Sequence, residues 1–236
     1  MIQYKNLTII GTSHISIESI KEVQIFINQN KPNIIALELD QKRFYSLQHK
    51  TSLKLKDIFQ LGIKAFLFNL IGSYIEKKLG KLVNVSPGSE MKTAIKLAKK
   101  YNLQISLIDQ DITITIKRFM KFLTWKEKFR FIYDIIHGII KRPKIQFDLT
   151  KVPSKKLIRK LMSKVKKDYP SVYKTLIHER NIIMAKNLNK LTSKHHDKTI
   201  LAIIGAGHEE DVFKILKRNK GVHYNSYSSN INIRIQ

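Results

Sequence analysis

Cysteine is absent from this 236-residue sequence. Its absence excludes a disulfide scaffold, a zinc site built on thiolates and a cysteine nucleophile. Long hydrophobic runs are absent too: the longest, over residues 58–75, is interrupted by Lys64 and Asn69, which makes it a poor membrane span. A lysine and an asparagine stand where the apolar stretch of a signal peptide would begin. We therefore expect a cytoplasmic protein with no C-terminal transmembrane region.

Acidic residues are scarce, since 18 Asp and Glu stand against 44 Lys and Arg, a net charge of +26. Only eight of the basic residues are arginine, the residue that specific phosphate and base recognition prefers. The lysine excess therefore has three readings: a solvated surface, attraction to an anionic membrane surface, or nucleic-acid binding. Of these three readings, nucleic-acid binding has the least support.

The length suggests a single domain over residues 1–236, and 43% hydrophobic residues are enough for a core. Residues 7–10 form a continuous apolar run, typical of a strand buried on both faces of a parallel sheet. Ser16 is a suitable N-cap for a helix that continues to about Gln29, and residues 33–39 predict the next strand. This β-α-β unit predicts an α/β fold.

The remaining elements alternate in the same way. Further strands are predicted over residues 103–109 and 199–204, with a final one compatible with 231–235. Helices are predicted over residues 90–101, 119–140, 171–191 and after 205. Residues 112–116 alternate apolar and hydroxyl side chains, which fits an edge strand or the start of the next helix. We expect a mostly parallel central sheet flanked by helices, with helical insertions at about 53–80 and 119–165.

Two segments match each other although nearly the whole chain separates them. Residues 7–14 and 201–208 share one pattern: an apolar strand, then Gly-x-x-His, then the start of a helix. The histidines of the two copies are His14 and His208. Ligands bind at the carboxyl ends of parallel strands, because helix N-termini and loop side chains converge there. If the two strands are near neighbours, both imidazoles face one cavity.

Carboxylates fall at the same edge of the predicted sheet. Glu38 and Asp40 close the second strand, and Asp109 closes the third. Two histidines and a strand-end carboxylate are the ligands expected for a hydrolytic divalent metal ion with an open coordination position. We therefore predict a metal site at His14, Glu38 and His208. The alternative is that hydrogen bonds satisfy the histidines and that Glu38 caps a helix or pairs with Arg43.

A charged pair falls inside a predicted helix. Glu179 shares a stripe with Leu176 and Ile183, and Arg180 lies beside it on the stripe of Met184. Inward charges are costly unless they meet partners. The pair either braces the fold as a buried ion pair or orients a substrate or ligand.

Three other charged residues are candidates. Glu90 opens a helix, where the helix dipole alone favours an acid. Arg43 and Arg118 either clamp a substrate oxygen or brace a nearby acid. The P-loop, Gly-x-Gly-x-x-Gly, Gly-x-Ser-x-Gly and His-Glu-x-x-His motifs are absent, so nucleotide-binding and standard hydrolase templates have no support.

Six short blocks together resemble the TraB/PrgY family, which is related to the Tiki proteins and to the erythromycin-esterase and ChaN-like proteins. In order, the blocks are Gly11-Thr12-Ser13-His14, Glu38-Leu39-Asp40 with Arg43, Pro87-Gly88-Ser89-Glu90-Met91, Ile108-Asp109-Gln110-Asp111 leading to Arg118, Glu179-Arg180, and Gly205-Ala206-Gly207-His208. The resemblance covers residues 5–218 and implies an erythromycin-esterase/ChaN-like fold. It also implies a cleft between the two Gly-x-x-His turns and a metal-dependent hydrolase. Bacterial members are associated with peptide-pheromone shutdown, and Tiki members with metal-dependent proteolysis.

The sequence departs from this family in three ways. Gln110 stands where relatives often carry arginine, and residues 209–211 after the last histidine are more acidic than expected, which would alter metal or substrate choice. Many microbial relatives carry membrane-spanning helices after this domain. Residues 119–142 instead combine Trp125 and several phenylalanines with lysines, the composition of a helix in a membrane interface. This would make the protein peripheral on the inner face of the membrane. Alternatively, the stripe packs on the domain or on a second subunit in a homo-oligomer.

The sequence thus predicts a hydrolase of peptides or other amides or esters that depends on a divalent metal ion, Mn, Co or Zn. Beside the metal ligands, the predicted general base or its orienter is Glu90 or Glu179, and the predicted substrate-positioning groups are Arg43, Arg118 and Arg180. The competing hypotheses are a non-catalytic regulatory protein at a membrane or partner surface, and a basic nucleic-acid binder.

Overall fold

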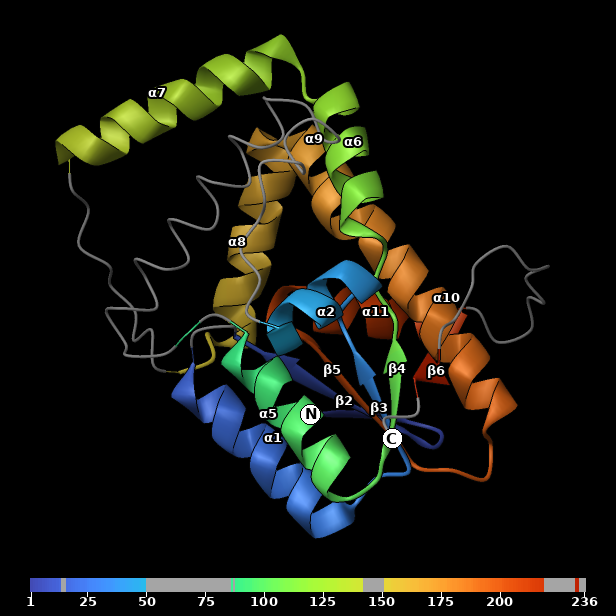
Figure 1. Ribbon diagram of the computed structural model, residues 1–236. Helices are drawn as coiled ribbons and strands as arrows, with labels where there is room; N and C mark the ends of the chain where they lie inside the picture. The colour runs from blue at the N-terminus through green and yellow to red at the C-terminus, as the bar shows by residue number, and fades with distance from the viewer. Residues whose placement is uncertain (14–15, 50–85, 87, 142–150, 219–231, 234–236) are drawn as a thin grey trace.

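A central six-stranded sheet organises the molecule, with strand order β1-β2-β5-β3-β4-β6 (Figure 1). The computed structural model describes residues 1–13, 16–49, 86, 88–141, 151–218 and 232–233. The strands are β1 (Ile2–Tyr4), β2 (Leu7–Thr12), β3 (Ile34–Leu37), β4 (Gln104–Leu107), β5 (Ile200–Gly205) and β6 (Asn232–Ile233). The four inner strands are parallel, and β1 and β6 pair antiparallel at the two edges. The predicted α/β fold with a mostly parallel sheet is confirmed.

Helices connect the strands and cover the sheet. In chain order the described helices are α1 (Ile17–Asn30), α2 (Gln41–His49), α5 (Ser89–Lys100), α6 (Ile112–Phe122), α7 (Trp125–Lys141), α8 (Lys155–Asp168), α9 (Pro170–Val172), the π-helix η1 (Tyr173–His178), α10 (Glu179–Lys194) and α11 (Ala206–Arg218). The helical insertion predicted at 53–80 lies outside the described residues.

Each face of the sheet has its own core. On one face, α10 and α11 pack Met184, Leu188 and Leu216 against β2, β3 and β5. On the other face, α1 and α5 pack Val23 and Met91 against the same strands and β4 (Figure 1). Side chains of β3 and β5 are buried on both sides, as their continuous apolar sequences predict. Each fully buried aliphatic side chain contributes about 1.5–3 kcal/mol relative to an exposed one.

Local signals explain how α1 and the first hairpin form. Ser16 is the N-cap of α1, since its side chain accepts a hydrogen bond of 3.2 Å from Ser19 N, as predicted. The helix ends at Asn30, one residue beyond the prediction, and Lys31 follows in the left-handed region. The β1–β2 hairpin was not predicted, because Lys5 supplies the positive φ of its turn where glycine or asparagine would have signalled one.

The predicted helix over 119–140 is wrong in its boundaries, because the chain forms two helices, α6 and α7. Residues 112–116 belong to α6, so the helix alternative holds there. The break is a capping box. Thr124 N and Oγ1 donate to Glu127 Oε2 over 3.0 and 2.7 Å, and Glu127 N donates back to Thr124 Oγ1 over 3.3 Å. This box starts α7 at Trp125 and turns it away from α6.

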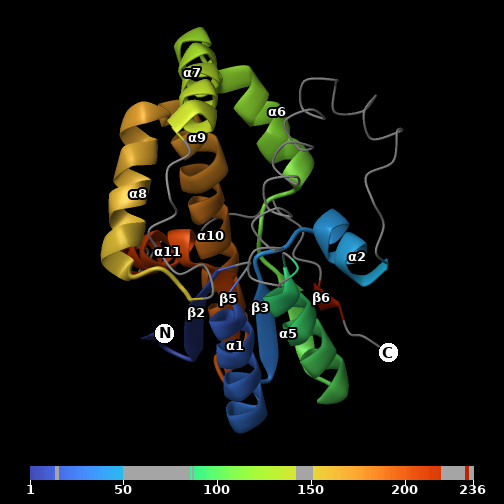
Figure 2. The same cartoon turned by 90° about the vertical axis from the view of Figure 1, so that its left-hand side faces the viewer.

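Helices α6, α7, α8 and α9 stand beyond the carboxyl edge of the sheet (Figure 2). The base of α8 is held by the acids at the start of α11: Lys155 Nζ lies 3.5 Å from Glu209, and Arg159 makes a two-pronged contact with Glu210. These two acids thus hold a helix, and their expected effect on metal or substrate choice stays a prediction. Within the described part of the chain, no helix has the length and apolar character needed to cross a membrane.

Candidate functional site

Charged side chains from four elements meet at the carboxyl edge of the parallel strands. Glu38 directly follows β3, and Asp109 is the second residue after β4. His208 lies in the first turn of α11, after β5. Arg180 reaches them from the first turn of α10. Asp40, also expected at this edge, caps α2: its Oδ1 accepts from the backbone N of residue 42 over 2.8 Å.

Glu38 connects the end of β3 to the second Gly-x-x-His turn. Its Oε2 accepts a hydrogen bond of 2.5 Å from Gly205 N, the last residue of β5. Its Oε1 accepts from Arg180 Nη2 and lies 3.5 Å from His208 Nε2. Because the side chain is almost fully buried, these contacts fix its position. Gly205 directly precedes α11, so this contact lies at a helix start, and the arginine that contacts Glu38 is Arg180 rather than the expected Arg43.

Two arginines converge on the buried carboxylate of Asp109. Arg180 Nη2 donates to Asp109 Oδ2 over 2.6 Å, and its Nε donates to Oδ1 over 3.1 Å. Arg43 Nη2 donates to the same Oδ2, while Arg43 Nε donates to Asp40 Oδ2 over 2.7 Å. Glu38, Asp40 and Asp109 are thereby bridged by two guanidinium groups, the geometry for which arginine is suited.

Both arginines stay cationic within this cluster. Burial by itself lowers the pKa of Arg180, but the adjacent Glu38 and Asp109 outweigh burial and raise its pKa above the usual value. Burial likewise opposes the charge of Arg43, and Asp109 and Asp40 raise its pKa overall. The two permanent cations are matched by the buried carboxylates of Glu38, Asp40 and Asp109, so they hold these acids in place rather than give this edge a net positive charge.

His208 is held in one tautomer by a residue that sequence reasoning missed. Its Nδ1 lies 2.6 Å from Oδ1 of Asn181, a fully buried side chain. An amide oxygen only accepts, so Nδ1 carries a proton, and in the neutral ring the lone pair is on Nε2. That Nε2 lies 3.4 Å from Arg180 Nη1, a group that only donates. The available signal was a polar residue on the apolar stripe of Met184 and Leu188.

A π-helix immediately precedes this part of α10. Residues 173–178 form η1, whose wider turns accommodate an extra residue relative to an α-helix. The predicted stripe of Leu176, Glu179 and Ile183 assumed an uninterrupted α period, and it is wrong as the buried face. Asn181 and Met184 are buried instead, with Arg180 directed into the cluster.

Glu179 pairs with Arg118 beside the cluster. Arg118 Nε and Nη2 donate to the two carboxylate oxygens of Glu179 over 2.6 and 2.8 Å, joining α6 to α10. The hydrogen bond from Arg118 lowers the pKa of Glu179, although partial burial opposes the shift. Glu90 is buried in the first turn of α5, and its part in the site stays a prediction.

The two Gly-x-x-His turns begin side by side. Strand β2 is parallel to β5, with Gly11 opposite Ile204 and Thr12 opposite Gly205, so the expected neighbouring of the two strands is confirmed. A Cβ on Gly11 would lie 2.9 Å from Glu209 Oε2, so glycine lets the second turn pack against the first. The predicted ligand His14 lies outside the described residues.

The described residues supply part of the predicted metal ligand set. No group of three or more histidine, aspartate or glutamate side chains placed to hold a metal ion occurs among them. Two of the three predicted ligands, Glu38 and His208, do converge, and Nε2 of His208 has the lone pair that a metal requires. These two donors fit a divalent ion, but the Arg180 guanidinium contacts both of them.

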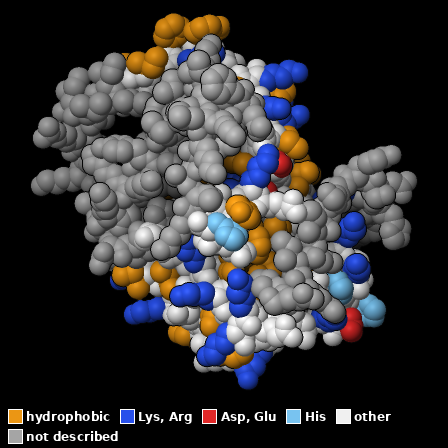
Figure 3. Space-filling view, in the orientation of Figure 1, with side chains coloured by type: hydrophobic (Ala, Val, Ile, Leu, Met, Phe, Trp, Pro, Cys, Tyr) orange, Lys and Arg blue, Asp and Glu red, His pale blue; other side chains and the backbone are white. Residues whose placement is uncertain are grey.

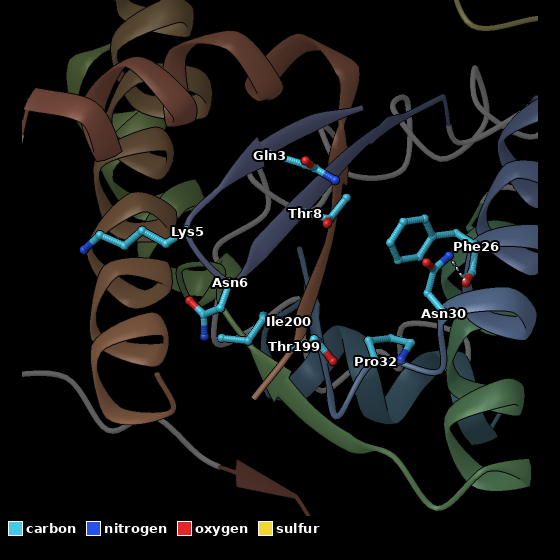
Figure 4. A pocket seen from close by; sticks show the side chains of 9 residues that line it. All are labelled: Gln3, Lys5, Asn6, Thr8, Phe26, Asn30, Pro32, Thr199 and Ile200. Atoms are coloured by element: carbon cyan, nitrogen blue, oxygen red, sulfur yellow. Dashed lines mark hydrogen bonds between the residues drawn. The ribbon is translucent and has the colours of Figure 1, made fainter. Parts of the chain in front are cut away.

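A pocket of about 280 Å³ lies at the opposite end of the sheet. Its lining comes from the start of β2 and β5 and the end of α1, including Thr8, Ile200 and Asn30 (Figure 4). Lys5 is the charged residue of this lining, so the pocket lacks the acids and histidines that catalysis at the other end would use. The acid–arginine–histidine cluster and this pocket therefore lie at different ends of the sheet.

Fold and site together define a three-layer α/β protein with an acid–arginine–histidine cluster at the carboxyl edge of its parallel strands. The chain belongs to the TraB/PrgY/gumN family, whose sequence signature matches residues 2–221. This confirms the resemblance drawn from the six sequence blocks.

Similar proteins occur in archaea and in animals. An uncharacterized protein of Methanocaldococcus jannaschii is 36% identical over 217 residues, which cover 90% of this chain and 54% of that protein. The human TraB domain-containing protein is 22% identical over 236 residues, and the mouse one 20% identical over 232; each match covers 87% of this chain. Both mammalian proteins are covered over 61% of their length, so the chain spans little more than half of these relatives.

Proposed function

We propose that this protein is a divalent-metal-dependent hydrolase that acts on a peptide or another amide or ester substrate. The observation that carries the proposal is the convergence of Glu38 and His208, 3.5 Å apart, with the permanently cationic Arg180 in contact with both. Membership of the TraB/PrgY/gumN family supports the same proposal.

Three side chains would hold the metal ion: Glu38 through Oε1, His208 through Nε2, and His14. A bound divalent ion lowers the pKa of a coordinated water towards neutrality and polarises a carbonyl group. Asn181 keeps the proton of His208 on Nδ1, which presents the lone pair of Nε2 to the site. Arg180 donates to the same oxygen of Glu38, so metal and guanidinium compete for one carboxylate oxygen.

The arginines would bind the substrate side of the reaction. Arg180 and Arg43 remain charged at all relevant pH values, so they can orient a carbonyl oxygen and stabilise negative charge that develops on it. Glu179 is less suited to accept a proton, because its pKa is lowered by Arg118 and a weakly basic carboxylate is a poor general base. Its contacts support the role of holding Arg118 in place. Glu90 remains the other proposed base.

A second candidate function rests on a specific observation. Glu38, Asp40 and Asp109 are already bridged by Arg43 and Arg180, as expected of a structural ion-pair network. A non-catalytic regulatory protein would use this network to fix the fold and would take up no metal.

Metal analysis of the purified protein separates the two functions. We expect the wild type, incubated with Mn²⁺, Co²⁺ or Zn²⁺ and then desalted, to retain one ion per chain. His14→Ala, His208→Ala and Glu38→Gln should lose it. His196→Ala is the matched control, because that exposed histidine lies beyond the opposite end of α10.

A mixture of synthetic peptides, followed by mass spectrometry, tests the reaction itself. Cleavage should require the ion, stop with a chelator and be absent in the three ligand variants. Retention of the ion by all three correctly folded variants contradicts the metal site. A wild type that binds the ion at this site but cleaves no amide or ester contradicts the hydrolase.

A further inference from the structure

Helix α7 carries an exposed stripe of large hydrophobic side chains. Its members are Trp125, Phe129, Ile132 and Tyr133, which are 70%, 66%, 53% and 64% exposed. At 100° per residue, spacings of three and four place all of them on one side of the helix. Figure 3 shows hydrophobic side chains gathered at the top of the molecule, over α7. Such a continuous exposed patch marks an interaction site more often than scattered single residues do.

The opposite side of α7 is fastened to the protein by polar contacts. Glu127 Oε1 accepts from Ser171 N over 2.7 Å, and Asp134 accepts from the hydroxyl of Tyr169 over 2.5 Å. Phe131 packs edge-on against Tyr169 with ring centroids 6.3 Å apart. Because these contacts fix the rotation of the helix about its axis, the aromatic stripe is turned outward and cannot fold back onto its own anchors.

Positive charge borders the stripe. Lys126 and Lys128 lie on its two sides by the helical period, and Lys128 Nζ lies 4.2 Å from the centre of the Trp125 ring. The sequence of α7 contains only two acids, Glu127 and Asp134, and both belong to the anchored side. The outward side from residue 125 to 133 therefore combines aromatic and cationic groups.

We propose that α7 lies on the surface of an anionic lipid bilayer, with its aromatic stripe among the headgroups and upper acyl chains. Aromatic side chains favour this interfacial region, and flanking lysines gain from the negative surface potential. A second copy of the chain is the weaker match, because face-to-face packing of two such stripes brings lysines together on molecules of net charge +26. This proposal does not depend on the hydrolase proposed above.

The single tryptophan of the chain, Trp125, lies on this stripe and serves as the probe. Vesicles of phosphatidylcholine alone are compared with vesicles of equal parts phosphatidylcholine and phosphatidylglycerol, using the full chain. We expect co-sedimentation and a blue shift of Trp125 emission with the anionic vesicles, and neither with the neutral ones.

Two double variants, each with its own control, separate the contributions of the hydrophobic stripe and of the lysines to vesicle binding. Phe129→Ser with Ile132→Ser should lose the blue shift, while Ile25→Ser, an exposed residue of α1, should keep it. Lys126→Gln with Lys128→Gln should bind anionic vesicles about 30-fold more weakly. The control with the same net charge, Lys99→Gln with Lys100→Gln on α5, should bind as the wild type does.

Several outcomes would overturn the proposal. Binding without a blue shift, or equal loss in both lysine variants, would assign it to net charge alone. A blue shift that appears without vesicles and grows with protein concentration would assign the stripe to a second copy. A concentration-independent blue shift without vesicles would assign it to a contact within the chain.

Discussion

The carboxyl edge of the sheet and helix α7 use charge in opposite ways. At the carboxyl edge, Arg43 and Arg180, whose side chains are 32% and 15% exposed, pair with the buried carboxylates of Glu38 and Asp109. On α7, the two acids accept hydrogen bonds on the inner side, and the outward side presents lysines and aromatic rings. In a chain with few arginines, the planar guanidinium is used where geometry must be fixed, and lysine where the charge faces outward.

Removal of Arg180 should produce the largest effect. Arg180→Ala leaves Glu38 and Asp109 buried with one cation fewer, so we expect the free energy of unfolding to fall by about 3–5 kcal/mol. Arg159→Ala is the matched control, because Arg159 makes an equally two-pronged contact with Glu210 at the exposed base of α8. Urea titrations measure both. Equal, small losses in the two variants would show that burial does not distinguish the two regions.

An intermediate effect is expected from Asn181→Ala. The buried partner of His208 Nδ1 is lost, which should lower the free energy of unfolding by about 1–3 kcal/mol. If the metal site exists, its affinity should fall about 10- to 100-fold as well. Asn187→Ala on the same helix is the control: its amide donates to the carbonyl of Ile108 over 2.9 Å, so stability should fall while metal affinity holds.

The smallest effect is a dependence on pH at the edge of the cluster. Arg118 lowers the pKa of Glu179 below 4.5, so the carboxylate stabilises the fold above about pH 4.5, and this contribution disappears as pH falls through the lowered pKa. The free energies of unfolding of the wild type and of Glu179→Gln should therefore differ at neutral pH and become equal in acid. Arg159 lowers the pKa of Glu210 in the same way, so Glu210→Gln should show the same dependence on pH. A difference that grows with acidity would contradict the assignment.

Much of the fold follows from the sequence because the inner strands are continuous apolar runs. The runs at 7–10 and 199–204 have no competing helical period, and both form neighbouring parallel strands. The break between α6 and α7 was missed, although Thr-x-x-Glu at residues 124–127 is a capping box by sequence alone. Aromatic periodicity on both sides of residue 124 concealed it.

The candidate site was predicted where strand ends determine it, and missed where helix geometry does. Glu38 and His208 follow β3 and β5, so topology alone brings them together. Asn181 lies on the stripe of Met184 and Leu188, but the stripe predicted to face inward was that of Leu176 and Ile183, which assumed no π-helix before α10. Arg180 was recognised as inward, but its simultaneous contact with three side chains is a property of the tertiary structure.

The Arg180 contacts also impose an order on biosynthesis. Glu38 and Asp109 leave the ribosome well before the arginine that bridges them, and Gly205, which donates to Glu38, comes later still. Until Arg180 and Gly205 have been synthesised, these two carboxylates lack their partners, so their burial costs free energy. The sheet centre is therefore expected to close late, when β5 inserts between β2 and β3 and the polymer is nearly complete.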